Sequence, residues 1–223
     1  MPTDNVKDVK LDENTFMNIL DLLVERYGIQ VPAHLDKPDP FRVLIGAMLS
    51  HRTRDEMTDL AFRRLFSTYG SIEDIVKAPL KEIRRLIKSV GFYRQKAKRI
   101  KDVAKILLER YDGQVPRDRV LLVELPGVGY KTADIVLSIA YGEPIVAVDT
   151  HVETVSKRLG IVRKKAGYEE TRKSIENITP SHMRRMVNGI LVKFGKEVCR
   201  KLRPRCEICP ITIYCEWYAR RRR

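Results

Sequence analysis

One stretch near the middle of the chain combines a glycine-rich turn with a lysine: residues 125–133 read LPGVGYKTA. Gly127 and Gly129 permit a tight turn and leave the first amide groups of a following helix open to an anion such as phosphate. Lys131 stands in that first turn, where the helix dipole and any burial favour the neutral amine over the ammonium. A neutral lysine can attack a sugar carbon and form a Schiff base. A lysine that only contacts phosphate is the alternative.

A carboxylate downstream, Asp149, is the second candidate for chemistry, and it follows the apolar run 145–148. A helix beginning at Lys131 would rise roughly 16 Å by residue 141. An extended return to Asp149 can span about 23 Å, so the carboxylate can come back beside the amine. However, Thr150 and Glu153 fit a capping box, which gives Asp149 a structural place at a helix start instead. The residues alone leave both roles open.

The four cysteines of the chain all lie in one short basic segment, at Cys199, Cys206, Cys209 and Cys215. Such clustering is typical of a metal site and not of a disulfide scaffold. Zinc sites commonly use paired Cys-x2-Cys knuckles, and only one such pair occurs here. Iron–sulfur clusters tolerate varied spacing. The spacing by itself leaves zinc and an iron–sulfur cluster as alternatives.

Three features in this order resemble the endonuclease III family of DNA glycosylases over nearly the whole chain: LPGVGYKTA, VDTH at residues 148–151, and the late cysteine cluster. The resemblance implies an enzyme that removes oxidised pyrimidines from duplex DNA and nicks the strand as an AP lyase. It implies Lys131 as the nucleophile, Asp149 as the catalytic carboxylate, and a [4Fe-4S] cluster on the four cysteines. It also implies DNA contacts from the helix-hairpin-helix, at Gly127, Val128, Gly129, Tyr130 and Thr132.

Two further stretches match the family in part. SHRTRD at residues 50–55 resembles a segment whose glutamine fills the space left by the flipped base, and that position is Arg52 here, which puts substrate choice in doubt. VGFYRQKA at residues 90–97 resembles a segment whose apolar residue wedges into the duplex, and Phe92 takes that place. The alternatives are a helix start capped by Asp55 and a Phe92 packed in the core. The cluster segment adds Arg200 and Lys201 as expected phosphate contacts.

The charge balance points to a polyanionic partner. The chain of 223 residues has 43 Lys and Arg against 29 Asp and Glu, a formal net charge of +14. A solubility device is the alternative for so dispersed a charge. The sequence shows no run of about 18 apolar residues and no signal-peptide pattern. We therefore expect double-stranded DNA with damaged bases or abasic sites as the partner, no membrane association, a monomer, and an intracellular location in the cytoplasm or nucleoid.

Apolar residues recur at helical spacing, and no segment alternates long enough for a sheet, so the predicted class is all-α. The resemblance implies two lobes: a six-helix domain with the helix-hairpin-helix at residues 33–143, and an iron–sulfur cluster domain formed by residues 1–32 and 144–223. A proline-containing connector is expected at residues 30–39. The predicted helices are 13–27, 40–49, 55–69, 71–78, 79–89, 96–111, 116–124, 131–142, 152–159, 167–178 and 180–194.

Two other functions compete with the lyase. A glycosylase directed at mismatches, removing thymine or uracil opposite guanine, is kept open by Arg52 and His51, although Lys131 argues against it. A helix-hairpin-helix DNA-binding module without chemistry would bind DNA in a salt-sensitive way and cleave nothing.

Overall fold

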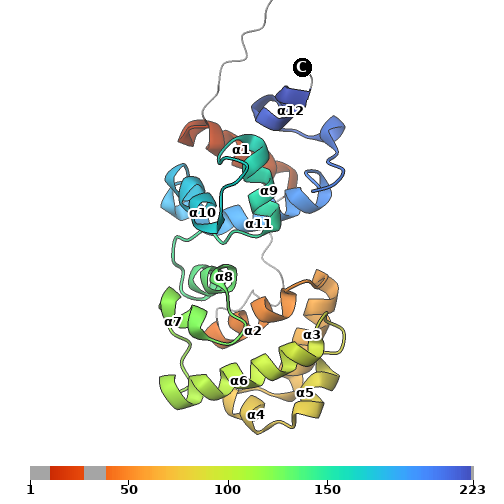
Figure 1. Ribbon diagram of the computed structural model, residues 1–223, viewed down its shortest axis with the longest axis vertical. Coiled ribbons are helices and arrows are strands. Elements are labelled where there is room, and N and C mark those ends of the chain that lie inside the picture. The colour runs from red at the N-terminus through yellow and green to blue at the C-terminus, as the bar shows by residue number, and fades with distance from the viewer. Residues whose placement is uncertain (1–10, 28–38, 222–223) are drawn as a thin grey trace, which may run out of the picture. The chain divides into compact units, whose positions relative to one another are not determined.

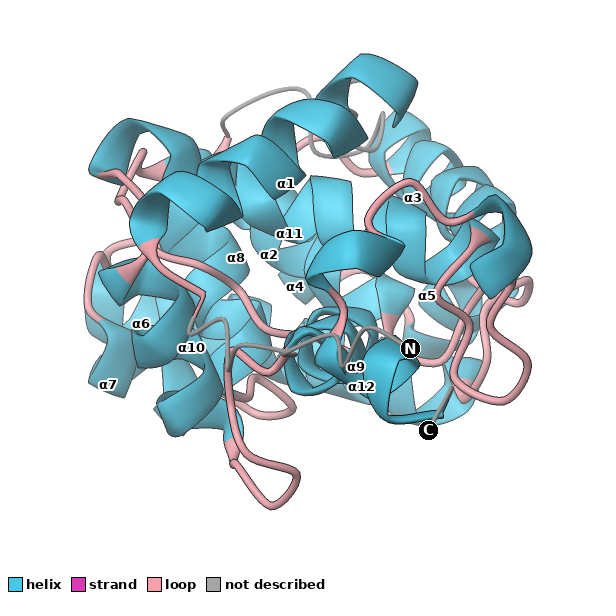
Figure 2. Ribbon diagram, turned by 90° about the horizontal axis from the view of Figure 1, so that it is seen from above, coloured by secondary structure: helices cyan, strands magenta, loops and turns pink. Residues whose placement is uncertain are grey.

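The computed structural model describes residues 11–27 and 39–221, and these residues form helices and loops with no strand (Figure 2). The predicted all-α class is confirmed. The chain divides into two compact units, one of residues 31–143 and the other of residues 1–30 together with 144–223. Within the described ranges no helix is long and apolar enough to span a bilayer. The expected connector at 30–39 lies, apart from its last residue, outside the described residues.

The unit of residues 31–143 is built around one apolar helix. Its helices are α2 (Pro40–Ser50), α3 (Asp55–Thr68), α4 (Ile72–Lys77), α5 (Leu80–Leu86), α6 (Tyr93–Tyr111), α7 (Arg119–Glu124) and α8 (Tyr130–Ala140), labelled in Figure 1. Every residue of α2 from Val43 to Leu49 is buried, and α2 packs against α3, α6 and α8. Helices α4 and α5 pack on α6. Helix α8, which follows the glycine hairpin, therefore packs directly on the buried helix α2.

Side-chain caps set several helix starts in this unit. Asp39 accepts a hydrogen bond from the Arg42 amide at 2.7 Å and so begins α2 at Pro40, as predicted. Asp118 accepts from the amides of Val120 and Leu121 at 2.8 and 3.0 Å. For this reason α7 begins at Arg119, and the prediction that the helix starts at residue 116 is wrong.

The unit of residues 1–30 and 144–223 has a second core. It contains α1 (Glu13–Tyr27), α9 (Thr150–Leu159), α10 (Tyr168–Asn177), α11 (Ser181–Glu197), two short 3-10 helices η2 (Cys206–Ile208) and η3 (Thr212–Tyr214), and α12 (Glu216–Arg221). Helix α11 packs against α1 and α9, and fully buried Phe16, Leu20 and Leu191 belong to this core. The predicted range of α1 is confirmed.

Other helix boundaries differ from the prediction. Helix α11 does not end at residue 194 but continues through Gly195 to Glu197. A Cβ added at Gly195 would lie 2.8 Å from both Cβ and Nδ1 of His151, so this glycine permits close packing of α11 on α9 and does not stop the helix. Helix α6 begins at Tyr93 instead of Lys96, and α5 ends at Leu86 instead of residue 89.

Candidate active site and cysteine cluster

In the hairpin between α7 and α8, one of the two glycines, Gly127, is required by the backbone conformation of the turn. Gly127 has φ +82°, and an added Cβ would lie 2.6 Å from Cδ of Arg99, whose side chain rests against the turn. The Val128 amide closes the turn by donating to the Leu125 carbonyl at 3.0 Å. Gly129 has an extended φ of −107°, and a Cβ added there would meet nothing within 4 Å. The absence of a side chain at Gly129 therefore leaves open space beside the turn.

A buried ion pair joins the two helices of the hairpin. Arg119 of α7 donates to the carboxylate of Asp134 on α8, from Nε at 2.6 Å and from an η nitrogen at 3.1 Å. The Asp134 side chain is 0% exposed, and the Arg119 guanidinium lies 4.5 Å from the Tyr130 ring centroid. Sequence reasoning missed this pair. An acidic residue in the middle of the apolar helix α8 was the available signal, because a buried carboxylate requires a partner.

Lys131 is the second residue of α8 and is half-buried. The next residue, Thr132, is buried, and its Oγ1 lies 2.9 Å from Nε2 of His51 in a hydrogen bond. Burial lowers the pKa of His51 to about 4, with further contributions from the positive charges of Lys131, Lys96 and Arg99. His51 is therefore neutral at physiological pH, and it adds no further cation beside the lysine.

Two exposed side chains lie on left-handed turns in the same unit. Arg52, just after α2, has φ +50°, and Phe92, just before α6, has φ +56°. The Arg52 guanidinium lies 5.7 Å from the Phe92 ring centroid, and Phe92 is 59% exposed. The alternative that Phe92 packs in the core is therefore wrong. The alternative of a cap by Asp55 is also wrong, because Arg54 is the N-cap residue and Asp55 is the first residue of α3.

A buried lysine lies beneath these turns. Lys96 is 6% exposed, and its ammonium donates to the carbonyls of Leu49 and His51, both at 2.6 Å, and to Oγ1 of Thr53 at 3.0 Å. Burial lowers the pKa of Lys96 to about 8. Sequence reasoning missed this residue. Its spacing relative to Ile100 on the inward face of the helix could have revealed it.

Asp149 is itself the N-cap of α9. Its Oδ1 accepts hydrogen bonds from the amides of His151 at 2.8 Å and Val152 at 2.9 Å, while Oδ2 takes part in neither bond. The segment before it is buried, and Asn188 donates to the Ala147 carbonyl at 2.7 Å. The capping alternative is thus confirmed, with Asp149 in place of Thr150 as the cap. Lys131 and Asp149 belong to different units.

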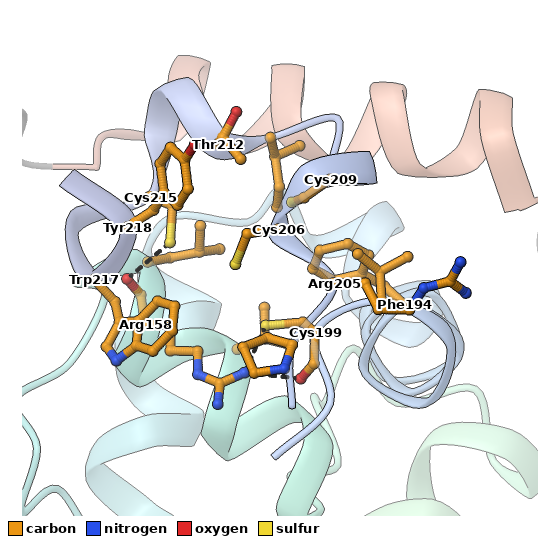
Figure 3. Close-up of a pocket in the computed structure, with 15 residues that line it drawn as sticks. Arg158, Phe194, Cys199, Arg205, Cys206, Cys209, Thr212, Cys215, Trp217 and Tyr218 are labelled. Carbon is orange, nitrogen blue, oxygen red and sulfur yellow. Dashed lines mark hydrogen bonds between the residues drawn. The ribbon is translucent and has the colours of Figure 1, made fainter. Parts of the chain in front are cut away.

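The cysteine segment folds around a cavity, shown close up in Figure 3. All four thiols line it, together with apolar side chains, and its described lining includes no imidazole or carboxylate. Burial raises the pKa of the Cys199 and Cys215 thiols and raises that of Cys209 to about 11. Among the described residues, no three His, Cys, Asp or Glu side chains are grouped to hold a single metal ion.

Arg158 of α9 holds the start of the cysteine segment in place. Its guanidinium donates to Sγ of Cys199 at 3.2 Å and to the carbonyls of Cys199, Arg200 and Lys201 at 3.0, 2.9 and 2.8 Å. It also lies 4.9 Å from the Trp217 ring centroid. Arg158 thus holds the carbonyls of Arg200 and Lys201, and the side chains of these two residues are exposed. No local sequence pattern signals this long-range role of Arg158, because its acceptors lie 41 to 43 residues away.

Comparison with known proteins identifies the family. Residues 45–181 match the model of the HhH-GPD superfamily base excision DNA repair proteins. The chain is 44% identical to endonuclease III of Thermotoga maritima, over 85% of this chain and 89% of that protein. The chain belongs to the endonuclease III family. Endonuclease III of Bacillus subtilis is 40% identical, over 88% of this chain and 91% of its own. The family predicted from the motifs is therefore confirmed.

Two solved structures have the same fold as this chain. A trapped covalent intermediate of endonuclease III with DNA matches with a TM-score of 0.85 at 36% identity, covering 96% of this chain and all of that one. A thermostable thymine-DNA glycosylase matches with a TM-score of 0.84 at 27% identity, covering 93% of this chain and 97% of that one. Membership of the endonuclease III family makes the chain an enzyme, so the alternative of a DNA-binding module without chemistry falls away.

Proposed function

We propose that this chain, a DNA glycosylase and AP lyase of base excision repair by its family, removes oxidised pyrimidines from duplex DNA. The observation that carries the proposal is the place of Lys131, half-buried in the first turn of α8 directly after the glycine hairpin. The amine of a lysine can act as a nucleophile that attacks a sugar carbon and forms a Schiff base.

In the proposed reaction the damaged nucleotide is first extruded from the duplex. The Nζ lone pair of Lys131 then attacks C1′, and the base leaves with the electron pair of its glycosidic bond. Opening of the sugar ring leaves a Schiff base between C1′ and Nζ. Loss of a proton from C2′ then expels the 3′ phosphate, which nicks the strand by β-elimination. Asp149 is the carboxylate proposed to assist the attack, while its Oδ1 caps α9.

The hairpin is proposed to hold the DNA backbone beside this lysine. Thr132 is buried, so we expect its contribution to come from its backbone amide, as for Gly127 and Gly129, whereas Val128, whose amide donates to the Leu125 carbonyl, would contribute by holding the turn. The open space at Gly129 leaves room for a phosphate to approach the start of α8. The exposed ring of Tyr130 borders the same surface.

Two other surfaces are proposed to contact DNA. Phe92 is exposed and apolar, as an intercalating wedge requires, and Arg52 beside it is proposed to contact the base left without a partner. Arg200 and Lys201 would contact phosphates from the cysteine segment, whose backbone Arg158 holds.

We further propose that Cys199, Cys206, Cys209 and Cys215 bind a [4Fe-4S] cluster. The donor set fits, because the four thiols line one cavity and four cysteine thiolates are the ligands that such a cluster takes. Iron would reverse the effect of burial by stabilising the thiolates. The cluster would supply a structural link holding the segment with Arg200 and Lys201, because base excision moves no electrons. Visible absorbance and iron and sulfide analysis of the purified protein test it.

The division into units fits this assignment. We propose that residues 33–143 form the helix-hairpin-helix domain and that residues 1–32 with 144–223 form the cluster domain, a division close to that of the two compact units. The enzyme is proposed to act as a monomer, which light scattering would test, and its substrate would place it at the nucleoid.

The test of the proposed function is a lesion panel with borohydride trapping. Duplexes containing thymine glycol, uracil, a G·T mispair, an adenine mispair or an abasic site are incubated with the enzyme and borohydride, which reduces a Schiff base to a stable amine. We expect adducts with the oxidised pyrimidine and the abasic site. Absence of an adduct with every damaged pyrimidine would overturn the proposal.

A mismatch-directed activity is the second candidate. It is favoured by Arg52 at the position of the family glutamine and by the structural match to a thermostable thymine-DNA glycosylase. The G·T duplex of the same panel decides it: thymine release faster than release of thymine glycol would favour this second function.

A further inference from the structure

A continuous set of hydrogen bonds ties together the two turns that carry Arg52 and Phe92. Oγ1 of Thr53 accepts from the Gly91 amide at 3.1 Å and from Nζ of Lys96 at 3.0 Å, and it donates to the His51 carbonyl at 3.1 Å. Through these bonds the residue after Arg52 is joined to the residue before Phe92. Gly91 itself permits the close approach, since an added Cβ would lie 2.8 Å from the Arg52 carbonyl oxygen.

Lys96 supplies the charge at the centre of this set. Three acceptors surround its ammonium, and two of them, the carbonyls of Leu49 and His51, belong to the end of α2 and the turn that follows. A buried ammonium is stable only when such acceptors replace its water. The left-handed conformation of Arg52 is unfavourable for a residue with a side chain, so the surrounding bonds must hold it.

His51 extends the same set to the helix that bears Lys131. Its carbonyl accepts from Lys96, and its ring bonds to Oγ1 of Thr132, the residue next to Lys131, at 2.9 Å. Because Thr132 is buried and follows the hairpin in the first turn of α8, a shift of His51 would be passed to that turn. Every member of this set lies within residues 31–143.

We propose that Lys96 and His51 are positioning residues that couple the turns of Arg52 and Phe92 to the turn of α8 that carries Lys131. Lys96 fixes both DNA-contacting turns, and His51 links them to the nucleophile. Correct seating of Phe92 and Arg52 in the duplex and correct placement of the amine therefore depend on one another. This inference rests on the proposed function for the role of Lys131, while the fixing of the two turns is independent of it.

The first test is Lys96→Met, which keeps an unbranched apolar side chain and removes the ammonium. The matched control is Lys101→Met on the same helix α6, since Lys101 also donates to a backbone carbonyl, that of Ala78. A displacement of about 1 Å at a reacting group can slow a reaction roughly 100-fold. We expect a loss of that order in single-turnover base release from duplex DNA for Lys96→Met, and a change below about 3-fold for Lys101→Met.

Two substrates separate positioning from general damage to the fold. Single-stranded DNA with an abasic site requires neither extrusion nor a wedge, so on this substrate Lys96→Met should lose only the part of the effect that reaches the amine through His51. Borohydride trapping should therefore fall far less on it than on the duplex. Thr53→Val removes only the hydroxyl that the bonds share, and it should also lose more activity on the duplex than on the single strand. This variant replaces Lys96→Met in the test if circular dichroism shows that Lys96→Met is poorly folded. Equal losses on both substrates in a folded variant would overturn the inference.

Two further measurements test the link. The double-variant cycle of His51→Ala and Thr132→Val should be non-additive in the trapping rate, and additivity would show that the ring does not act through Thr132. Fluorescence of 2-aminopurine opposite the lesion reports seating of the wedge upon binding, without chemistry. The increase in fluorescence on binding should be lost in Lys96→Met and kept in Lys101→Met. If the wild-type enzyme showed the fluorescence increase on binding but formed no adduct, the proposed function would be overturned. The inference that Lys96 fixes the two turns would still hold.

Discussion

Replacing Arg119 by methionine tests whether the buried ion pair stabilises the helix-hairpin-helix. The variant keeps an unbranched apolar side chain and removes both hydrogen bonds to Asp134, which are 2.6 and 3.1 Å long. The carboxylate would then stay in a fully buried position without its guanidinium partner. We therefore expect Arg119→Met to destabilise the unit of residues 31–143.

The magnitude follows from burial. Removing one member of a buried ion pair costs roughly 3–5 kcal/mol, and we expect the lower end because the Arg119 side chain is 24% exposed. A control lies two residues earlier: Arg117 donates from Nε to Glu143 at 2.8 Å, but these side chains are 62% and 31% exposed. Arg117→Met should cost below about 1 kcal/mol. The two variants should thus differ by about 2 kcal/mol.

Urea unfolding followed by circular dichroism at neutral pH measures both variants. A third variant, Arg119→Met with Asp134→Leu, should recover most of the loss, because an apolar pair of similar volume carries no buried charge. Equal urea midpoints for Arg119→Met and Arg117→Met would refute the argument that burial determines how much an ion pair contributes to the free energy of unfolding.

Three other predictions follow. Because His51 has a pKa of about 4 in the fold against 6.5 in the unfolded chain, the unfolded chain binds more protons between these values, and stability should fall as pH drops from 6.5 to 4. The loss is at most about 3 kcal/mol, and smaller because the ring is half-buried; His51→Asn should flatten this dependence in urea titrations. Cys209→Ser should lose visible absorbance and bound iron, and unchanged iron content would contradict the ligand assignment. Phe92→Ala should slow base release from duplex DNA about 10- to 100-fold, with cleavage of single-stranded abasic DNA unchanged in a gel assay.

The sequence pattern predicts those helices and turns whose boundaries are determined by neighbouring residues in the chain. The apolar spacing of residues 13–27 predicts α1 correctly, and Pro40 predicts the start of α2. The glycine at 127 marks the hairpin turn, where φ is positive. These signals are local because each depends on hydrogen bonds or sterics within one helical turn.

The missed features depend on contacts between residues far apart in the sequence. Gly195 looks like a helix stop until His151 is seen packed against it. Lys96 looks like one of the solvated lysines of α6, yet its three acceptors lie 43 to 47 residues away. The spacing of Lys96 relative to Ile100 indicates the inward face, but the carbonyls that it meets there follow from the packing of α6 on α2, which the pattern of one helix does not specify.

The most direct test of the account is to map the covalent adduct with DNA. After borohydride trapping on a duplex with thymine glycol, proteolysis and mass spectrometry should find the reduced sugar fragment on Lys131. The variant Lys131→Gln should bind the same duplex and form no adduct, whereas Lys105→Gln, at an exposed lysine of α6, should form it normally. An adduct on another residue, or an undiminished adduct in Lys131→Gln, would contradict the central claim that this amine attacks the sugar.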